Sequence, residues 1–421
     1  MIFKQNPILL HFLTTFGTRC ITMLFSFGQG IIVARALLPA GRGTIGVYAT
    51  ILGLVFACCG IRQSTAFYLG KRNLPYEKVL RLQRWGFLVL LTILSAMMLG
   101  ILATKGMLKD WRMALLLEIL LAVQIKETMM NGILSARREI PALNVGSLLI
   151  SGLSFSVMVI CYCVYRSSAL YFYFVAVILG NAAALLFYRF RIRKLSFPDA
   201  PPGTAIEPLR REVGVFLLTG LNFALPLLIL DLNYQLNILI ISYMDLPMKE
   251  VGLYTQAVSM MNLIWFLPRI MAQVIFAYSV STKNEKAFSL KLWSVMKLIM
   301  VCLLPVCIVG GLLTPYLLPL IYGKEFAGAA APFLIMLPGI YLMIAFKVLN
   351  SDFIANGHSM KVSVIFGIAL LINLALDWKL IPHWGIRGAA TASSVSYIFA
   401  TIVFVIAYYR ALILPARRRT A

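Results

Sequence analysis

Long apolar stretches separated by short polar loops make up almost the whole chain. Because a membrane-spanning helix needs roughly 20 apolar residues, this pattern predicts about twelve transmembrane helices. We expect them near residues 8–37, 44–69, 86–104, 113–136, 144–165, 169–190, 215–243, 251–280, 290–313, 331–355, 360–381 and 385–409. The predicted fold class is therefore an all-α polytopic membrane protein.

Composition supports this interpretation and gives the charge a meaning. The 421 residues are 61% hydrophobic and only 13% charged, which excludes a soluble domain of this size. The net charge of +23 would suggest nucleic acid in a soluble protein, but here the basic residues lie mostly in short loops. Loops on the side of the amino terminus hold about twice as many as the opposite loops, which predicts that both termini are cytoplasmic. The apolar segment after the amino terminus is expected to be a retained helix and not a cleaved signal peptide.

A division into two lobes is predicted from the longest loop and from internal similarity. The proline-rich loop suggests an N-terminal lobe over 1–194, a cytoplasmic linker over 195–211 and a C-terminal lobe over 212–421. The sequence GVYA at 46–49 is echoed by GLYT at 252–255, and NGILSA at 131–136 by NSDFIA at 350–355. Two echoes in the same order predict two six-helix lobes related by a pseudo-twofold axis along the membrane normal.

Some basic residues fall inside the predicted spans, where a charge costs about 2.5–3.5 kcal/mol near the bilayer centre. They are Arg19, Arg62, Lys126, Arg269, Lys297 and Lys347. One interpretation is a cationic cavity for an anion such as a diphosphate, which the planar arginine fork binds well. The other is pairing with the intramembrane carboxylates for helix packing, or, for Lys297 and Lys347, snorkelling towards the cytoplasmic side. The carboxylates are Glu118, Glu127, Asp231, Asp352 and Asp377.

The carboxylates themselves admit two roles. Asp231 shares a helix face with Gln235 and could couple transport to an ion or could balance the arginines. Glu127 follows Lys126 directly, so the two side chains must point in different directions. Asp352 lies near the cytoplasmic end of its span, where we expect it to meet water.

Enzymatic chemistry is not expected. The three histidines have no metal-ligand spacing with one another or with a cysteine, and no phosphate-binding loop is present. We therefore predict no catalytic residue, metal or cofactor, and the seven cysteines are expected to be buried thiols inside apolar runs. Pro226, Pro305 and Pro338 fall within spans; they could bend helices of a rocking transporter or reflect the frequency of proline in membrane helices.

Three short motifs resemble one family. The stretch GIIVARALLPAGRG at 30–43, followed by VYA at 47–49, resembles the first-hairpin signature of Wzx-type polysaccharide flippases. These flippases belong to the multidrug/oligosaccharidyl-lipid/polysaccharide (MOP) exporter superfamily. The stretches VGLY at 251–254 and IPHWGIRGAA at 381–390 resemble further family motifs in the second half.

This resemblance implies a MOP flippase fold and a function. The protein would flip undecaprenyl-diphosphate-linked oligosaccharide units, as in O-antigen and lipopolysaccharide assembly, across the bacterial inner membrane by alternating access. A cationic central cavity would hold the headgroup, and a gradient of H+ or Na+ or the membrane potential could drive the step. Arg19 and Arg62 lie at places comparable to arginines in the first two helices of lipid II flippases, whereas Arg269 has no such counterpart.

The resemblance implies a monomer whose partners are the lipid-linked oligosaccharide, the bilayer and other membrane proteins of polysaccharide assembly, and it implies no nucleic-acid partner. Two other functions stay open. A multidrug exporter of the same fold often carries cations, which a cavity rich in arginine and lysine disfavours. A membrane polymerase or glycosyltransferase would carry a large outer loop, and every predicted outer loop here is short.

Overall fold

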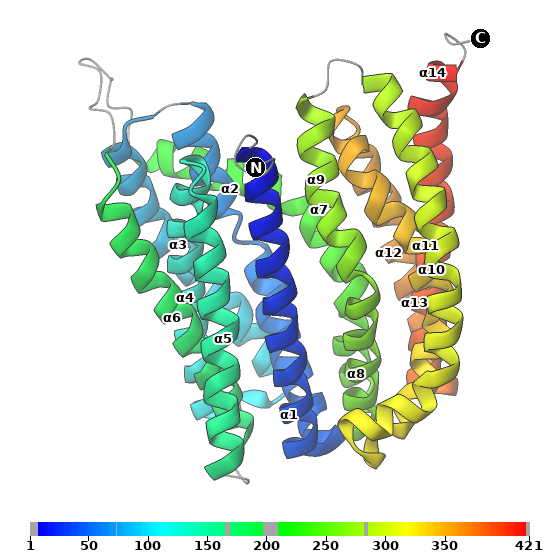
Figure 1. The fold of residues 1–421 in the computed structure, drawn as a ribbon. Coiled ribbons are helices and arrows are strands. Elements are labelled where there is room, and N and C mark those ends of the chain that lie inside the picture. The colour runs from blue at the N-terminus through cyan, green and yellow to red at the C-terminus, as the bar shows by residue number, and fades with distance from the viewer. Residues whose placement is uncertain (1–6, 73, 165–168, 197–208, 282–284, 418–421) are drawn as a thin grey trace. The chain divides into compact units, whose positions relative to one another are not determined.

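The computed structural model describes residues 7–72, 74–164, 169–196, 209–281 and 285–417, and these contain helices and no strand (Figure 1). The central part of the predicted linker over 195–211 lies outside the described residues. The long helices are α1 (Pro7–Ala57), α3 (Tyr76–Thr104), α4 (Trp111–Ala136), α5 (Ile140–Val164), α6 (Ala169–Arg193), α7 (Leu209–Tyr243), α10 (Glu285–Tyr322), α11 (Ala330–Ala355), α12 (Ser359–Trp384) and α13 (Ile386–Tyr408). The shorter elements are α2 (Ile61–Ala66), α8 (Met248–Ile264), α9 (Phe266–Ser281) and α14 (Leu414–Arg417), π-helices over Phe67–Lys71 and Tyr409–Ile413, and 3-10 turns over Met107–Lys109 and Lys324–Ala329.

The prediction of about twelve spans in an all-α membrane protein is confirmed. Nine stretches of the described residues are long and apolar enough to cross a membrane. The first of them, Thr14–Lys71, covers two predicted spans, because α1 continues through a kink at Leu38 (φ 58°) just before Pro39. Helix α4 is not among the nine, since Glu118, Lys126 and Glu127 lower its hydropathy. The eighth predicted span is split into α8 and α9 at Trp265.

The chain forms two compact units. Unit 1 comprises residues 1–37 and 51–228, and unit 2 comprises 38–50 and 229–421. The boundary thus runs through α7 and not through the loop before it, and a short segment of α1 packs with the second half of the chain.

In unit 1, close helix packing places α2. A Cβ atom on Gly132 of α4 would stand only 2.8 Å from Thr65 Cβ and 2.9 Å from the backbone oxygen of Arg62, so α2 and α4 touch through a glycine. Gln83 of α3 donates to Thr65 Oγ1 (2.8 Å) and to the Met129 carbonyl (3.2 Å), which ties three helices together. The buried amide of Gln83 therefore holds the end of α2 against α3 and α4.

In unit 2, α11, α12 and α13 lie side by side and enclose an aromatic core (Figure 1). Phe346 of α11 contacts Phe366 of α12 and Phe404 of α13, with ring centroids 4.4 and 4.9 Å apart. Gly339 permits the close approach of α11 to Ser394 of α13. This core supports the polar groups described below.

The expectation that all cysteines are buried is wrong in part. All seven are free thiols; Cys59 and Cys307 are buried, whereas Cys163 and Cys302 are exposed. Both exposed thiols lie on long apolar helices, α5 and α10, whose outer faces in a membrane meet lipid instead of protein.

Candidate functional site

Arg19 and Arg62 come together in unit 1. Helix α1 carries Arg19, and Arg62 stands in the first turn of α2, which begins after Gly60 adopts a left-handed backbone (φ 53°). Ile61 is fully buried while Arg62 is exposed, so the restart of the helix turns the guanidinium away from the core. The two guanidinium charges are close enough to repel each other. Across the described residues, neither guanidinium has a hydrogen bond or an ion pair.

Glu127 and Tyr188 interact electrostatically with these arginines. The Glu127 side chain is 8% exposed and accepts a hydrogen bond from Thr128 Oγ1 (3.2 Å), and the Asn131 side chain also acts on its charge. The same Asn131 contacts the Tyr188 hydroxyl, which feels the charges of both arginines. Arg62 attracts Glu127 electrostatically but does not pair with it. Within the described residues, neither guanidinium of this cluster thus has an ion-pair partner.

The other predicted cation of unit 1 lies elsewhere on α4. Lys126 Nζ sits 3.7 Å from the centroid of the Phe87 ring on α3, near Arg84. Lys126 and Glu127 therefore contact different elements, as their adjacency on one helix requires.

In unit 2, Asp231, Arg269 and Lys347 interact electrostatically. Asp231 of α7 is attracted chiefly by Arg269 and then by Lys347. Arg269 is exposed and donates to Asn262 Oδ1 (3.2 Å). Lys347 donates to the Tyr234 hydroxyl (3.3 Å), and its Nζ lies over the rings of Trp265 and Tyr234. Lys297 is exposed on α10, 5.7 Å from the Trp293 ring centroid.

Asp352 was expected to meet water because it lies near the end of a span, but the structure shows that it is buried. Its side chain is 0% exposed, and its two oxygens accept from Ser279 (2.5 Å), Ser289 (2.7 Å) and Tyr408 (2.6 Å). Asn356 also donates to Oδ1 (3.2 Å). The carboxylate therefore joins α9, α10 and α13 to α11, and hydrogen bonding satisfies it without a cation.

A second buried carboxylate, which sequence reasoning treated only as a counter-charge, has different surroundings. Asp377 of α12 is 0% exposed, and its Oδ1 accepts from Asn237 Nδ2 of α7 (3.2 Å). The same amide donates to Ser393 Oγ (3.0 Å) and to the Ala389 carbonyl (3.2 Å) of α13. Among the described residues, Asp377 Oδ2 and Asn237 Oδ1 are buried without a hydrogen-bond partner.

These oxygens form a potential cation or proton site. A buried carboxylate is costly unless a proton, a cation or several donors compensate it, and an all-oxygen donor set suits a hard cation. Asn373, one turn before Asp377 on α12, is 1% exposed and faces the same way. The four-residue spacing of Asn373 and Asp377 on one helix is a signal that the sequence offers for this site. Asn237 and Ser393 lie on other helices, and the sequence does not indicate that they meet Asp377.

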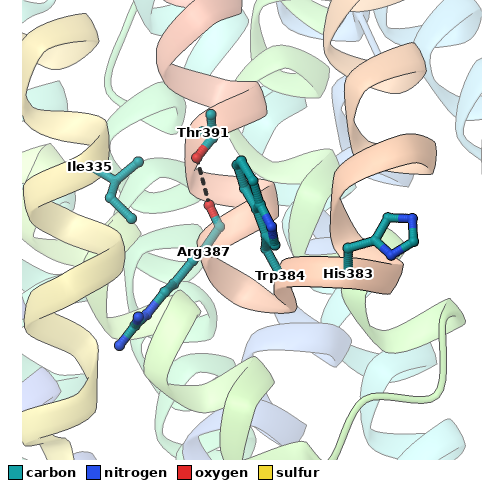
Figure 2. Close-up of a pocket in the computed structure, with 5 residues that line it drawn as sticks. All are labelled: Ile335, His383, Trp384, Arg387 and Thr391. Atoms are coloured by element: carbon teal, nitrogen blue, oxygen red, sulfur yellow. Dashed lines mark hydrogen bonds between the residues drawn. The ribbon is translucent and has the colours of Figure 1, made fainter.

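The turn between α12 and α13 borders a cavity of about 580 Å³, lined by Ile335, His383, Trp384, Arg387 and Thr391 (Figure 2). The turn depends on Gly385 (φ 54°). Trp384 lies between His383 and the other lining residues, and Thr391 Oγ1 donates to the Arg387 carbonyl (2.9 Å). The IPHWGIRGAA stretch singled out in the sequence thus contributes His383, Trp384 and Arg387 to the lining of this cavity.

Comparison with known proteins places the fold. No protein-family model and no curated protein matches the sequence. Among solved structures, an inward-facing multidrug resistance MATE family transporter of the MOP superfamily matches with a TM-score of 0.70 and 15% identity, covering 97% of this chain and 100% of the other. The lipid II flippase MurJ in an inward closed conformation matches with a TM-score of 0.73 and 13% identity, covering 95% and 87%. The chain has the fold of the MOP-superfamily transporters.

A third solved structure is similar to this chain over nearly its whole length. It is a MOP superfamily transporter from Pyrococcus furiosus, described as having a binding pocket of reverse polarity that suggests a different function. Its TM-score is 0.65 at 16% identity, with 97% of this chain and 95% of the other covered.

Proposed function

We propose that this protein is a flippase that moves an undecaprenyl-diphosphate-linked oligosaccharide across the bacterial inner membrane by alternating access. The observation that carries the proposal is the pair of exposed guanidinium groups of Arg19 and Arg62 in unit 1, which act on each other electrostatically and form no ion pair with a carboxylate among the described residues. Two arginine forks match a diphosphate in charge and in hydrogen-bond geometry. Among the fold neighbours is a lipid II flippase.

The remaining cations take secondary roles in this proposal. Arg269 presents an exposed guanidinium, and Lys126, Lys297 and Lys347 raise the positive potential of their units. We place both termini in the cytoplasm, following the loop charges. The protein acts as a monomer beside other membrane proteins of polysaccharide assembly.

Coupling to an ion is part of the proposal. We assign the coupling to Asp377, with Asn237, Asn373 and Ser393 beside it, because one carboxylate oxygen there lacks a partner. Asp231 and Glu127 balance the charges of Arg269 and Arg62 at longer range, without forming an ion pair with them. Asp352 is already satisfied by hydroxyl groups and is assigned a structural role.

Multidrug export is a second candidate, favoured by the similarity to the MATE family transporter. Two arginines without an ion-pair partner repel a cationic drug and attract an anionic headgroup. The two candidates therefore differ in the sign of the substrate charge that Arg19 and Arg62 favour.

The test is transport in proteoliposomes that contain a fluorescent undecaprenyl-diphosphate oligosaccharide, scored by protection from an impermeant quencher. We expect movement with the wild type and a loss of at least about tenfold in rate for Arg19→Ala and for Arg62→Ala, since each removes a charged hydrogen bond worth roughly 1.5–3 kcal/mol. Arg112→Ala, which removes an exposed arginine next to Trp111, is the matched control and is expected to transport normally. Equal rates in all four proteins would remove the anion site, and ethidium transport with no lipid movement would favour the multidrug exporter.

A further inference from the structure

Three aromatic side chains of unit 2 pack against one another, and two of them contact an ammonium group. The ring centroids of Tyr234 and Trp265 are 4.9 Å apart, and each lies 5.9 Å from that of Tyr397. Lys347 Nζ lies 4.0 Å from the Trp265 centroid and 4.6 Å from the Tyr234 centroid. These distances are well within the range of a cation–π interaction, which extends to about 6 Å. We call Tyr234, Trp265 and Tyr397 the aromatic box.

The box is rigid without help from its occupant. Trp265 is 0% exposed, and its indole Nε1 donates to the Ile340 carbonyl (3.0 Å). Tyr397 is 2% exposed, and its hydroxyl donates to the Asn233 carbonyl (3.1 Å). Hydrogen bonds at the ring edges therefore hold the rings of α13 and of the α8–α9 junction in place. A preorganised site binds its ligand at a lower entropic cost than one that must be assembled.

The other lysines near aromatic rings lack this enclosure. Lys297 contacts Trp293, its neighbour one turn away on α10, at 5.7 Å and is exposed. Lys126 contacts Phe87 alone among the ring contacts of the described residues. Lys347 is half-buried, touches two rings and donates a hydrogen bond to one of them. Enclosure by several faces is the arrangement by which proteins recognise organic ammonium groups.

We propose that the aromatic box is a binding site for organic ammonium ions and that Lys347 is its built-in occupant. The tethered ammonium blocks the site to free cationic solutes, which makes Lys347 a specificity-determining residue. The Arg269 charge reinforces the exclusion, while Asp231 partly offsets it. The consequence for transport selectivity rests on the proposed function; the occupancy of the box does not.

The first experiment empties the box. n-Propylammonium carries the same atoms that Lys347→Ala removes beyond Cβ, so it is the probe, used with the full chain in nanodiscs. A ligand that binds only the folded state raises its stability by mass action. We expect n-propylammonium to raise the melting temperature of Lys347→Ala and to leave that of the wild type unchanged. n-Propanol, which has the same shape without the charge, is expected to have no effect.

Two variants serve as controls. Lys347→Met fills the same space with an uncharged chain and is expected not to respond to the probe. Lys297→Ala removes the unenclosed lysine over Trp293 and is likewise expected not to respond. An equal response in Lys297→Ala and Lys347→Ala, or no response in a folded Lys347→Ala, would overturn the proposal.

A second measurement needs no substitution and covers the case in which Lys347→Ala does not fold. Reductive methylation of the wild type in nanodiscs, followed by mass spectrometry, compares the reactivity of two lysines of unit 2. We expect Lys297 to be modified at least tenfold faster than Lys347, because the box shields the latter ammonium. Equal rates would show that Lys347 leaves the box freely, which contradicts its role as a fixed occupant. Neither experiment depends on the lipid substrate, so failure of the flippase assay leaves both results interpretable.

Discussion

Gly43 and Gly252 stand back to back in unit 2. A Cβ atom on Gly43 would collide with the Met248 carbonyl oxygen, and one on Gly252 would collide with the Pro39 carbonyl oxygen. The segment of α1 after its kink is thereby fastened to α8, and Arg42 adds a hydrogen bond to Ser259 Oγ (2.9 Å). Gly43 lies three residues before the GVYA stretch at 46–49, and Gly252 begins the GLYT stretch at 252–255. The two internally similar stretches are in contact, because a Cβ atom on Gly46 would meet the Thr255 side chain.

This contact predicts that Gly43→Ala and Gly252→Ala each destabilise the protein by about 1–3 kcal/mol, because backbone atoms cannot yield as a flexible side chain can. The measurement is the thermal midpoint in detergent, followed by size-exclusion chromatography. Gly30→Ala is the control, since nothing lies within 4 Å of its added Cβ. Unchanged midpoints for both tight glycines would contradict the close packing of α1 against α8.

The hydrogen bonds to Asp352 predict a stability effect at the junction of α9, α10, α11 and α13. Tyr408→Phe removes the hydroxyl that donates to Oδ2 (2.6 Å), with an expected loss of roughly 1.5–3 kcal/mol for a bond to a charged group. A double-mutant cycle with Asp352→Asn is the measurement, and we expect the two losses to be strongly non-additive. Tyr316→Phe, which changes a side chain that is 75% exposed, is expected to be neutral.

The Asp377 cluster predicts an ion effect. We expect the thermal stability of the wild type to respond to Na+ or to pH through this cluster. Asp377→Asn neutralises a carboxyl with an unpartnered oxygen, so the variant is expected to fold and to lose that response. Asp352→Asn is the comparison, because that carboxylate is equally buried but already accepts four hydrogen bonds. If Asp377→Asn retained the ion response and Asp352→Asn lost it, the assignment of the coupling to Asp377 would be wrong and Asp352 would be the coupling residue.

In unit 1, Asp110 predicts a local stability effect at the start of α4. Its Oδ1 accepts from the backbone N–H of Met113 (3.2 Å), and its Oδ2 accepts from the Tyr171 hydroxyl (2.8 Å). Asp110→Ala removes the helix cap and is expected to cost about 1–2 kcal/mol. Tyr171→Phe removes only the second bond and should cost less. Chemical denaturation monitored by helix content measures both; a larger loss in Tyr171→Phe would contradict the capping role.

The sequence predicted the helices and the charges well, but not the groups that surround the charges. Arg19 and Arg62 were expected to act together, and they do lie within electrostatic range in unit 1. Lys347 was expected to hold an anion or to snorkel; its ammonium lies against two aromatic rings, which the sequence did not indicate. Asp352 was expected to meet water and is fully buried.

The sequence alone determined that this is an all-α membrane protein of about twelve spans with cations inside them, because hydropathy and length are local properties of a chain. Tertiary structure decided which side chains meet. The Asn237 amide reaches Asp377 across 140 positions, and a segment of α1 belongs to unit 2. Such contacts depend on how each helix is rotated and packed, and a periodic apolar pattern does not specify that rotation when lipid and protein faces are both apolar.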